Sequence, residues 1–358
     1  MQTDFLIIGQ GIAGSLLADE LLKRNQKILV VDNNHSAASS IIAAGLFNPI
    51  VFKRFVKSWR ADELIPFAAH IYTELEKKLK KRFYFQKNII KIFASEDEFK
   101  FWEVKRQENP FMATATKHNP SLEKTIYAPF GTGEVFESGN VNISLLLNEY
   151  KEFLTGQKLL ISGKINYNDI IIEEEGLSWK DIRAKKIIFC EGHQATNNPY
   201  FTWLPFKLTK GELLTVEIKE LQTDKVINKG VFILPIARNT YRVGATYKWD
   251  EFSETITEEG KSELTQKLEK LLKVPYRILQ QEAGIRPTVS DRRPLLGVHP
   301  VHGQLLIFNG MGTKGVLIAP FFASHFADYI TGKISTLDRE VDIKRISKKS
   351  DFNQAKAF

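Results

Sequence analysis

Three glycines near the start of the chain stand at the spacing of a phosphate-binding turn. Gly9, Gly11 and Gly14 form G-x-G-x-x-G directly after the apolar run at residues 5–8. The first glycine allows a tight turn, the second lets the backbone approach a pyrophosphate, and the third lets a helix pack closely on the strand. Because the N–H groups at a helix N-terminus have no partner within the helix, this turn favours binding of a dinucleotide through its phosphates.

An acidic residue follows at the position where such motifs contact a ribose. Asp32 ends the next apolar run, at residues 27–31. A carboxylate there accepts hydrogen bonds from ribose hydroxyls and repels a 2′-phosphate, which disfavours NADP. A glycine turn without a ligand is the alternative, and the strand, helix and acid together argue against it. On this stretch alone, NAD and FAD remain open.

The elements that must position this turn are predicted from periodicity and capping residues. Ser95 and Asn142 are expected to be the N-caps of two helices. Strands alternate apolar and polar residues in the middle of the chain, as in an antiparallel sheet. The predicted strands are 5–8, 27–31, 88–95, 133–139, 185–192, 211–218, 229–236 and 239–247, and the predicted helices are 61–82, 96–109, 143–155 and 256–273. Residues 304–330 again predict strand, glycine-rich turn and helix.

Composition sets limits on the class of protein. The chain has 358 residues, of which 43% are hydrophobic and 26% charged, which is ordinary for a soluble globular protein of about two domains. Apolar runs stay below the ~18 residues of a membrane span, and the nucleotide strand begins where a signal peptide would lie. The single cysteine, Cys190, excludes an internal disulfide and a cysteine-cluster metal site. We therefore expect a cytoplasmic protein without a metal.

The chain is basic, with a net charge of +8. Such a balance fits a nucleic acid, an anionic surface or an anionic small substrate. The densest basic run is residues 77–82, at the end of a predicted helix, where cations are favourable. No RNA-binding signature accompanies it, so a solvated helix end is the favoured interpretation over an RNA-binding patch.

Longer motifs add a resemblance to a known family. They are SSIIAAGL (39–46), GATY (244–247), AGIRPTVSDRRPLLG (283–297) and NGMGTKGVLIAP (309–320). With the glycine turn, the chain resembles FAD-dependent amine oxidoreductases of the D-amino acid oxidase superfamily, particularly glycine oxidases. The resemblance extends over most of the chain and favours FAD as the cofactor.

The resemblance and the predicted elements together imply a discontinuous organisation. The fold class is α/β, with a Rossmann-type FAD-binding domain interrupted by an antiparallel-sheet α+β substrate domain. The FAD-binding domain is predicted to comprise residues 1–50, 135–205 and 280–345, and the substrate domain residues 51–134 and 206–279. Residues 346–358 are predicted to be a tail.

The resemblance also implies which residues hold the cofactor. The turn, with Ile12 and Ala13, would hold the pyrophosphate, and Asp32, with Asn33, the adenosine ribose. Ile165 would offer its backbone to the adenine, and Gly192 would also lie along the cofactor. The remaining implied residues are Ser39, Ser40, Ala44, Gly45 and Leu46 along the phosphates and flavin, and Gly310, Met311, Gly312, Thr313, Lys314 and Gly315 at the flavin ring, where a helix N-terminus stabilises negative charge on the reduced ring.

Arg286 matches the residue that binds the substrate carboxylate in this family. A guanidinium holds a carboxylate through two parallel hydrogen bonds, which fixes its orientation. The alternative is a salt bridge at a domain interface. Leu46, Phe232 and Arg54 would complete the substrate pocket.

The chain departs from glycine oxidases at two of these positions. Phe232 replaces a tyrosine that also binds the carboxylate, so free glycine is a doubtful substrate. Thr313 replaces an arginine near the flavin. The missing positive charge would come from one of the basic residues Lys53, Arg54, Lys57 and Arg60, whose other interpretation is a solvated basic face.

The expected activity follows from the resemblance. Some relatives attach the flavin covalently through a histidine or a cysteine, but Ile42 precedes Ala43 here and Cys190 lies in a predicted buried strand, so we expect non-covalent FAD. The predicted enzyme oxidises an amine or amino acid bearing a carboxylate by hydride transfer to flavin N5, followed by hydrolysis of the imine. The alternatives are a tRNA-uridine-modifying FAD oxidase acting on a carboxymethylaminomethyl group, with tRNA as partner, and a non-catalytic flavin-binding protein.

Overall fold

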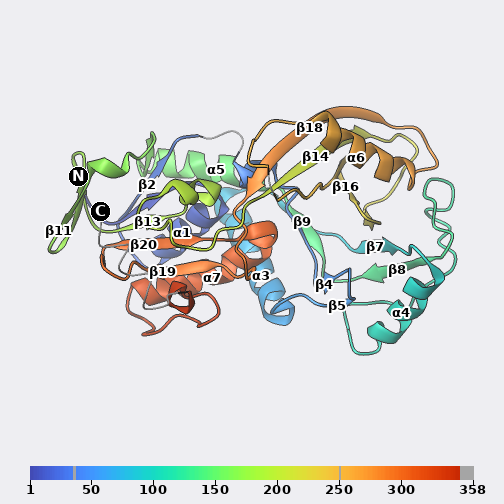
Figure 1. Ribbon diagram of the computed structural model, residues 1–358, viewed down its shortest axis with the longest axis horizontal. Coiled ribbons are helices and arrows are strands. Elements are labelled where there is room, and N and C mark those ends of the chain that lie inside the picture. The colour runs from blue at the N-terminus through green and yellow to red at the C-terminus, as the bar shows by residue number, and fades with distance from the viewer. Residues whose placement is uncertain (35–37, 250, 347–358) are drawn as a thin grey trace.

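The computed structural model describes residues 1–34, 38–249 and 251–346, and the predicted tail falls almost entirely outside them. The chain forms two lobes (Figure 1). The first lobe contains an eight-stranded sheet. Six of its strands follow the order β10-β2-β1-β13-β12-β11, β20 pairs with β13, and β19 pairs with β20. Its strands are β1 (Gln2–Ile8), β2 (Ile28–Asp32), β10 (Leu160–Ser162), β11 (Ile170–Glu173), β12 (Gly176–Trp179), β13 (Ile182–Phe189), β19 (Leu295–Val298) and β20 (Leu305–Asn309).

The parallel core of this sheet confirms the predicted nucleotide-binding unit. β10, β2, β1, β13 and β20 run parallel, and the carboxyl ends of β1, β2 and β13 lie side by side. Helix α1 (Ile12–Lys23) connects β1 to β2. Asn25 has a φ of 58° in the turn after α1, a conformation that asparagine tolerates better than most residues.

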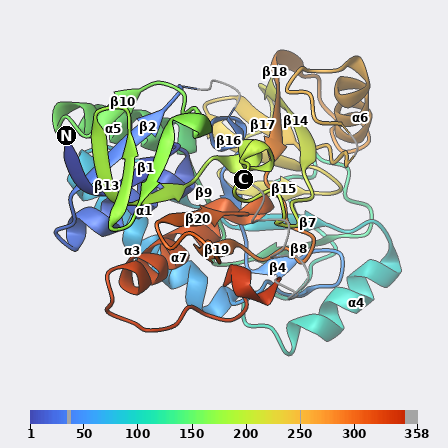
Figure 2. The same ribbon diagram turned by 60° about the vertical axis from the view of Figure 1, so that its left-hand side comes forward.

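Helices cover one face of the first sheet. α3 (Ala61–Leu79), α5 (Ile143–Gly156) and α7 (Gly315–Ile330) join α1 in one apolar cluster. In Figure 2, α3 and α7 lie together below the sheet, and the Tyr72 hydroxyl donates to the Val316 carbonyl over 2.7 Å. The sequence assigned residues 61–79 to the substrate domain, but this packing places α3 in the first lobe.

The second lobe is built on a seven-stranded sheet with the order β18-β14-β17-β16-β15-β7-β8. Its strands are β7 (Ile89–Ile92), β8 (Thr132–Val135), β14 (Thr209–Glu217), β15 (Val226–Asn228), β16 (Phe232–Ala237), β17 (Thr240–Gly244) and β18 (Arg277–Arg286). The predicted antiparallel pairing is confirmed for β14, β16 and β17, whereas β15 pairs with β7 in parallel. Helices α4 (Glu96–Arg106) and α6 (Glu258–Glu269) belong to this lobe (Figure 1).

The remaining elements are short. α2 is Ser39–Ile42, and the small strands are β3 (Leu46–Phe47), β4 (Ile50–Val51), β5 (Val56–Lys57), β6 (Tyr84–Gln86) and β9 (Gly139–Val141). The 3-10 helices are η1 (Tyr167–Asp169), η2 (Gly192–Asn197), η3 (Gly312–Lys314) and η4 (Ile343–Arg345). No helix in the described part of the chain is long and apolar enough to cross a membrane.

Several predicted elements have different bounds in the structure, and two of these differences have a clear local cause. The helix predicted at 61–82 ends at Leu79, because Lys80 adopts a φ of 54° that terminates it. The strand predicted at 133–139 divides into β8 and β9, with Glu137 at a φ of 51° between them, because these halves pair in different sheets. The predicted caps are confirmed, since Ser95 and Asn142 accept from the backbone N–H groups of Glu98 and Leu145.

Candidate active site

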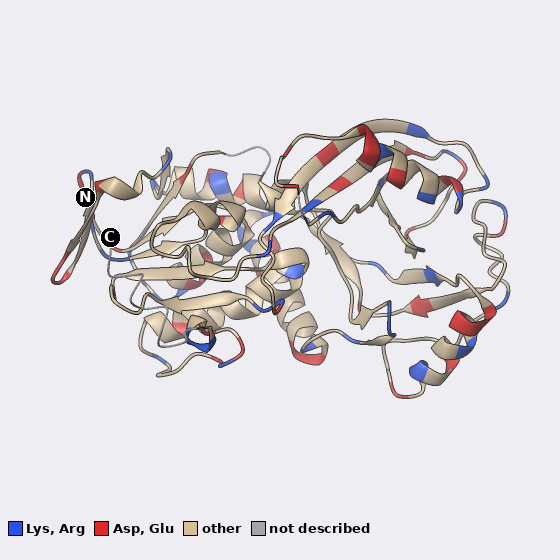
Figure 3. Cartoon of the chain, viewed as in Figure 1, with Lys and Arg blue, Asp and Glu red and all other residues tan. Residues whose placement is uncertain are grey.

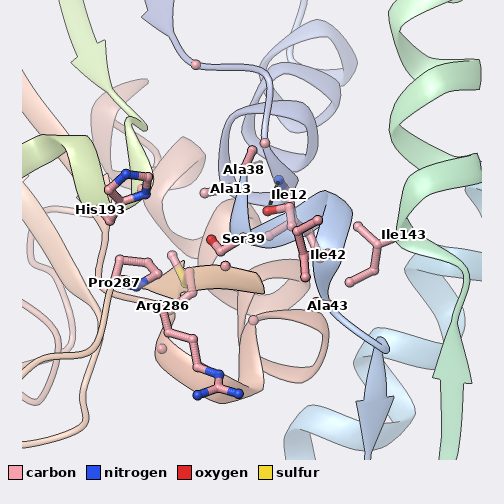
Figure 4. A pocket seen from close by; sticks show the side chains of 18 of the residues that line it. Ile12, Ala13, Ala38, Ser39, Ile42, Ala43, Ile143, His193, Arg286 and Pro287 are labelled. Atoms are coloured by element: carbon pink, nitrogen blue, oxygen red, sulfur yellow. Dashed lines mark hydrogen bonds between the residues drawn. The ribbon is translucent and has the colours of Figure 1, made fainter. Parts of the chain in front are cut away.

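A cavity of about 470 Å³ lies where the two lobes meet. The glycine turn, α2 and the start of α7 line it from the first lobe, and β14, β16 and β18 line it from the second. Figure 4 shows Arg286 reaching into the cavity that Ile12, Ser39 and Ile42 also line. The predicted residues that line it are Gly9, Gly11, Ile12, Ala13, Asp32, Asn33, Ser39, Ser40, Ala44, Gly45, Leu46, Ile165, Gly192, Phe232, Arg286, Met311, Gly312, Thr313, Lys314 and Gly315.

The glycine turn leaves no room for side chains on its inner face. Gly9 has a φ of 100°, and a Cβ there would lie 2.6 Å from the Cys190 carbonyl oxygen. A Cβ on Gly14 would lie 1.9 Å from the Gly9 carbonyl oxygen. Gly14 does not line the cavity, so its role is to let α1 pack against the turn, as the motif predicts.

Asp32 fixes the glycine turn through its carboxylate. Oδ2 accepts from the Gln10 N–H and Oδ1 from the Asn34 N–H, both over 2.7 Å. A carboxylate has about four lone-pair positions, so each oxygen can accept a further hydrogen bond from the cavity. Asp32 therefore also stabilises the glycine turn, a role that the sequence motif does not indicate.

The small-residue segment after Asp32 runs along the cavity wall. The Ser40 hydroxyl accepts from the Ile12 N–H over 3.2 Å and joins α2 to the first turn of α1. Ile42 packs against Gly284 of β18, since a Cβ on Gly284 would lie 3.2 Å from the Ile42 Cβ. Segment and turn therefore form a continuous wall of small and apolar groups.

The C-terminal glycine-rich turn places a helix N-terminus and a cation at the cavity. α7 begins at Gly315, and Lys314 stands directly before it. The Lys314 ammonium donates to the Ser58 hydroxyl over 2.6 Å, and no described carboxylate lies within ion-pair distance. Burial lowers the pKa of Lys314 to about 8. Gly310 does not line the cavity and packs behind it on Val289 and Leu295.

Arg286 enters the cavity from the end of β18. Its Nη1 donates to the carbonyls of Lys210 and Thr246 over 3.3 and 3.4 Å, and its Nη2 donates to Thr246 over 3.3 Å. The guanidinium lies 5.2 Å from the ring centre of Tyr247 and against Gly211, where a Cβ would collide with it at 1.8 Å. Burial lowers its pKa. No ion pair joins Arg286 to a described residue, so nothing in these contacts supports a salt bridge at the interface.

The basic residues proposed to replace the missing arginine do not reach the cavity. Arg54 and Lys53 are exposed in the turn between β4 and β5. Lys57 pairs with Asp62, and Arg60 pairs with Asp338. None of these basic residues is part of the lining, so the assignment of Arg54 to the substrate pocket does not agree with its position. Lys314 supplies a positive charge there instead.

Several lining residues were not predicted as site residues. They are Ala38, Ile42, Ala43, Phe47, Asn48, Ile143, Gly163, Lys164, Tyr167, Cys190, Glu191, His193, Gln194, Gly211, Leu213, Ala245, Thr246, Tyr247, Gly284, Pro287, Asn309, Val316 and Leu317, together with Ile8 and Val31. Thr246 and Tyr247 belong to the GATY motif, so the motif itself could have indicated that they line the site. Glu191 lies near the end of the strand predicted at 185–192, and a carboxylate at the carboxyl end of a parallel strand is a second signal.

Comparison with known proteins identifies the family. The family model described as FAD dependent oxidoreductase matches residues 4–329. The chain belongs to this family. It is 22% identical to glycine oxidase of Bacillus subtilis (strain 168), over 92% of this chain and 93% of that protein.

Two further similarities agree with this. A structure of glycine oxidase from Geobacillus kaustophilus aligns with a TM-score of 0.80 at 21% identity, covering 94% of this chain and 97% of the other, which establishes a shared fold. The tRNA 5-methylaminomethyl-2-thiouridine biosynthesis bifunctional protein of Legionella pneumophila (strain Corby) is 22% identical over 94% of this chain and 55% of its own length.

The geometry of this FAD-dependent oxidoreductase fits its cofactor. Gly9 and Gly11 line the cavity without side chains, so the backbone of the turn is accessible to a pyrophosphate, and Asp32 retains acceptor capacity for a ribose. The start of α7 offers backbone N–H groups at the other end of the lining. Among the described residues, no group of His, Cys, Asp or Glu side chains could hold a metal ion. The predicted fold class and FAD as cofactor are confirmed.

Proposed function

We propose that the enzyme oxidises an amine or amino acid that bears a carboxylate, and that Arg286 binds this carboxylate. The observation that carries the proposal is a partly buried guanidinium that lines the cavity without an anionic partner among the described residues. A buried charge is costly unless it is paired, which favours an anionic ligand at this position.

The hydrogen bonds of Arg286 leave capacity for a carboxylate. Its contacts with the Lys210 and Thr246 carbonyls use three of the five N–H donors of a guanidinium. The remaining donors are available to a substrate. Pro287 follows Arg286, which keeps the Arg286 backbone extended. The Thr246 carbonyl and the Tyr247 ring hold the side chain in place, so the substrate would be bound in one orientation.

The wall beside Arg286 favours a substrate larger than glycine. Leu46, Leu213 and Phe232 line the cavity with apolar side chains. Leu213 and Phe232 lie together over Gly244, where a Cβ would be 2.0 and 3.1 Å from them. Phe232 cannot donate a hydrogen bond to a carboxylate, so Arg286 would bind it without help from this position. An apolar portion of the substrate, or a substituent on its nitrogen, would fill this space.

The chemistry is divided between cofactor and chain. FAD, when bound, would supply the oxidant for removal of a hydride from the substrate Cα, and the released imine would hydrolyse in water. The acids that line the cavity are Asp32 and Glu191, which both lie beside the glycine turn rather than beside Arg286. The amine would therefore bind neutral. Lys314 and the N-terminus of α7 would stabilise negative charge on the reduced cofactor.

Anaerobic bleaching of the flavin absorbance tests this function. A panel should pair each amino acid or N-substituted amino acid with the amine that lacks its carboxylate. We expect reduction only by members that carry the carboxylate, and bleaching by the amines alone would contradict the assignment. Acid precipitation should release the yellow colour as FAD, because Ile42 stands where some relatives have the attaching histidine and burial raises the pKa of the Cys190 thiol, which keeps it unreactive. A yellow precipitate would indicate a covalent flavin.

A tRNA-modifying oxidase is the second candidate, which the net charge of +8 and the Legionella relative favour. The basic run at 77–82 argues against it, because Lys78 pairs with Asp19 and Lys81 with Glu149. Figure 3 shows acidic residues interspersed with basic ones in both lobes. Binding to tRNA should fall steeply with salt if RNA is the substrate. Absence of binding at low salt would remove this candidate. A non-catalytic flavin protein is the third interpretation, and it leaves the unpaired Arg286 unexplained.

A further inference from the structure

Glu191 is an acid at the nucleotide end of the cavity for which the proposed reaction has no use. It follows β13 and lines the cavity. The strand end contacts the glycine turn, since a Cβ on Gly9 would lie 2.6 Å from the Cys190 carbonyl oxygen and 3.6 Å from the Glu191 Cα. The backbone of Glu191 therefore lies against the glycine turn, and the residue belongs to the same part of the lining.

Two neutral side chains from separate elements hold the Glu191 carboxyl. The Tyr167 hydroxyl of η1 donates to Oε1 over 2.7 Å, and the Asn198 amide donates to Oε2 over 2.9 Å. Asn198 is fully buried, and Tyr167 also lines the cavity. No described lysine, arginine or histidine forms an ion pair with Glu191. Burial raises the pKa of Glu191 to about 7, although hydrogen bonds from Asn198 and Tyr167 oppose the shift.

The other titratable groups around Glu191 do not compensate a negative charge. The Cys190 thiol stays neutral, because burial and Glu191 raise its pKa, and burial likewise raises the pKa of Tyr167. His193 pairs with Glu254 at 3.3 Å. Asp32 adds a second acid beside the turn, and Lys164 is an exposed cation on the lining. An ionised carboxylate in this lining and a diphosphate at the adjacent glycine turn would therefore repel one another, because no described cation pairs with Glu191.

We propose that FAD binds together with a proton on Glu191, so that the affinity for the cofactor falls as this carboxyl ionises. The diphosphate carries negative charge, and binding also removes water from the lining, and both effects favour the neutral acid in the complex. The complex then holds one more proton than the free protein in the range where free Glu191 is ionised. Below pH of about 7 the affinity should be constant, and above it the dissociation constant should rise up to about tenfold per pH unit.

The test measures the dissociation constant for FAD. The holoenzyme is diluted at pH values between about 6 and about 9, and flavin fluorescence reports the FAD that is released. The native protein should show the rise in dissociation constant, whereas Glu191→Gln, which keeps the size of the side chain and is always neutral, should show none. At about pH 9 the variant should bind FAD at least about tenfold more tightly than the native protein. Asp169→Asn is the matched control, because Asp169 is an exposed acid of η1 off the cavity, and it should retain the native profile.

Tyr167→Phe provides an independent readout. It removes a hydrogen bond that favours the ionised carboxylate, so the pH at which affinity begins to fall should move upward. Three results would overturn the proposal: equal profiles for the native protein and Glu191→Gln, affinity that rises with pH in the native protein, or a Tyr167→Phe midpoint that stays or moves down. Loss of FAD from Glu191→Gln at every pH would also overturn it, since the neutral form would then not suffice.

Discussion

The two ends of the cavity are lined by different kinds of groups. At the nucleotide end, backbone and glycines form the surface, and the Asp32 carboxylate fixes their geometry. At the substrate end, side chains form it, with the Arg286 guanidinium held by backbone carbonyls and by Tyr247. One consequence is that the glycine turn depends on steric fit, whereas the substrate end depends on charge and orientation. Substitutions at the two ends should therefore fail in different ways.

The largest effect is expected at the substrate end. Arg286→Lys keeps the charge but loses the planar fork, so a bound carboxylate would be misplaced. FAD should stay bound, while flavin reduction by the true substrate should slow by at least about 10²-fold, since misplacement alone can cost this much. Rapid-reaction absorbance under anaerobic conditions measures this rate.

The controls for Arg286 separate a substrate clamp from a structural role. Arg54→Lys, at an exposed position outside the cavity, should leave the rate of flavin reduction by substrate unchanged. Any amine without a carboxylate that reduces the flavin should react equally with native and Arg286→Lys protein. Unchanged reduction by the true substrate, or loss of FAD, would show that Arg286 has another role.

At the nucleotide end, Gly14→Ala should fail by overpacking. The added Cβ would lie 1.9 Å from the Gly9 carbonyl oxygen, so the turn or α1 must shift. Overpacking of this kind costs about 1–3 kcal/mol of the free energy of unfolding, and the thermal midpoint and FAD affinity should fall together. Gly156→Ala at the end of α5 is the matched control, because nothing lies within 4 Å of its added Cβ. A native-like Gly14→Ala protein would mean that the turn is not sterically fixed.

Asp32→Ala should weaken FAD binding without preventing reduction of the cofactor that remains bound. The change leaves the Gln10 and Asn34 N–H groups without their acceptor and removes the acceptor for the ribose. The expected loss is about 1–3 kcal/mol of binding free energy, the scale of an unmade hydrogen bond to a charged group. Fluorescence titration gives the dissociation constant. An unchanged dissociation constant would mean that the backbone of the turn binds FAD without a contribution from the Asp32 carboxylate.

The same contrast explains what could be predicted from the sequence. The nucleotide end is local in sequence, so Gly9, Gly11 and Asp32 indicate it within one strand-turn-helix-strand unit, and Asn142 and Ser95 likewise mark helices by local capping. The substrate end is assembled from distant strands. Nothing local shows that Lys210 and Thr246 hold Arg286, or that Arg54 turns away while Lys314 faces inward. The division of 133–139 between two sheets is equally non-local, because tertiary pairing decides it.

The smallest effect is expected on the affinity for an anionic ligand as Lys314 loses its charge. It tests whether charge governs binding at the substrate end. With a pKa of about 8, Lys314 is positive below this pH and loses its charge above it. An anionic ligand in the cavity should therefore bind more weakly as the pH rises through about 8, by up to about tenfold per unit. Benzoate, which stays ionised throughout this range, can be titrated against the flavin absorbance. Lys314→Met should remove the decline, and Lys53→Met, at an exposed position off the lining, should retain it. A decline that persists in Lys314→Met would place the titrating group elsewhere and leave Arg286 as the cation that binds the ligand.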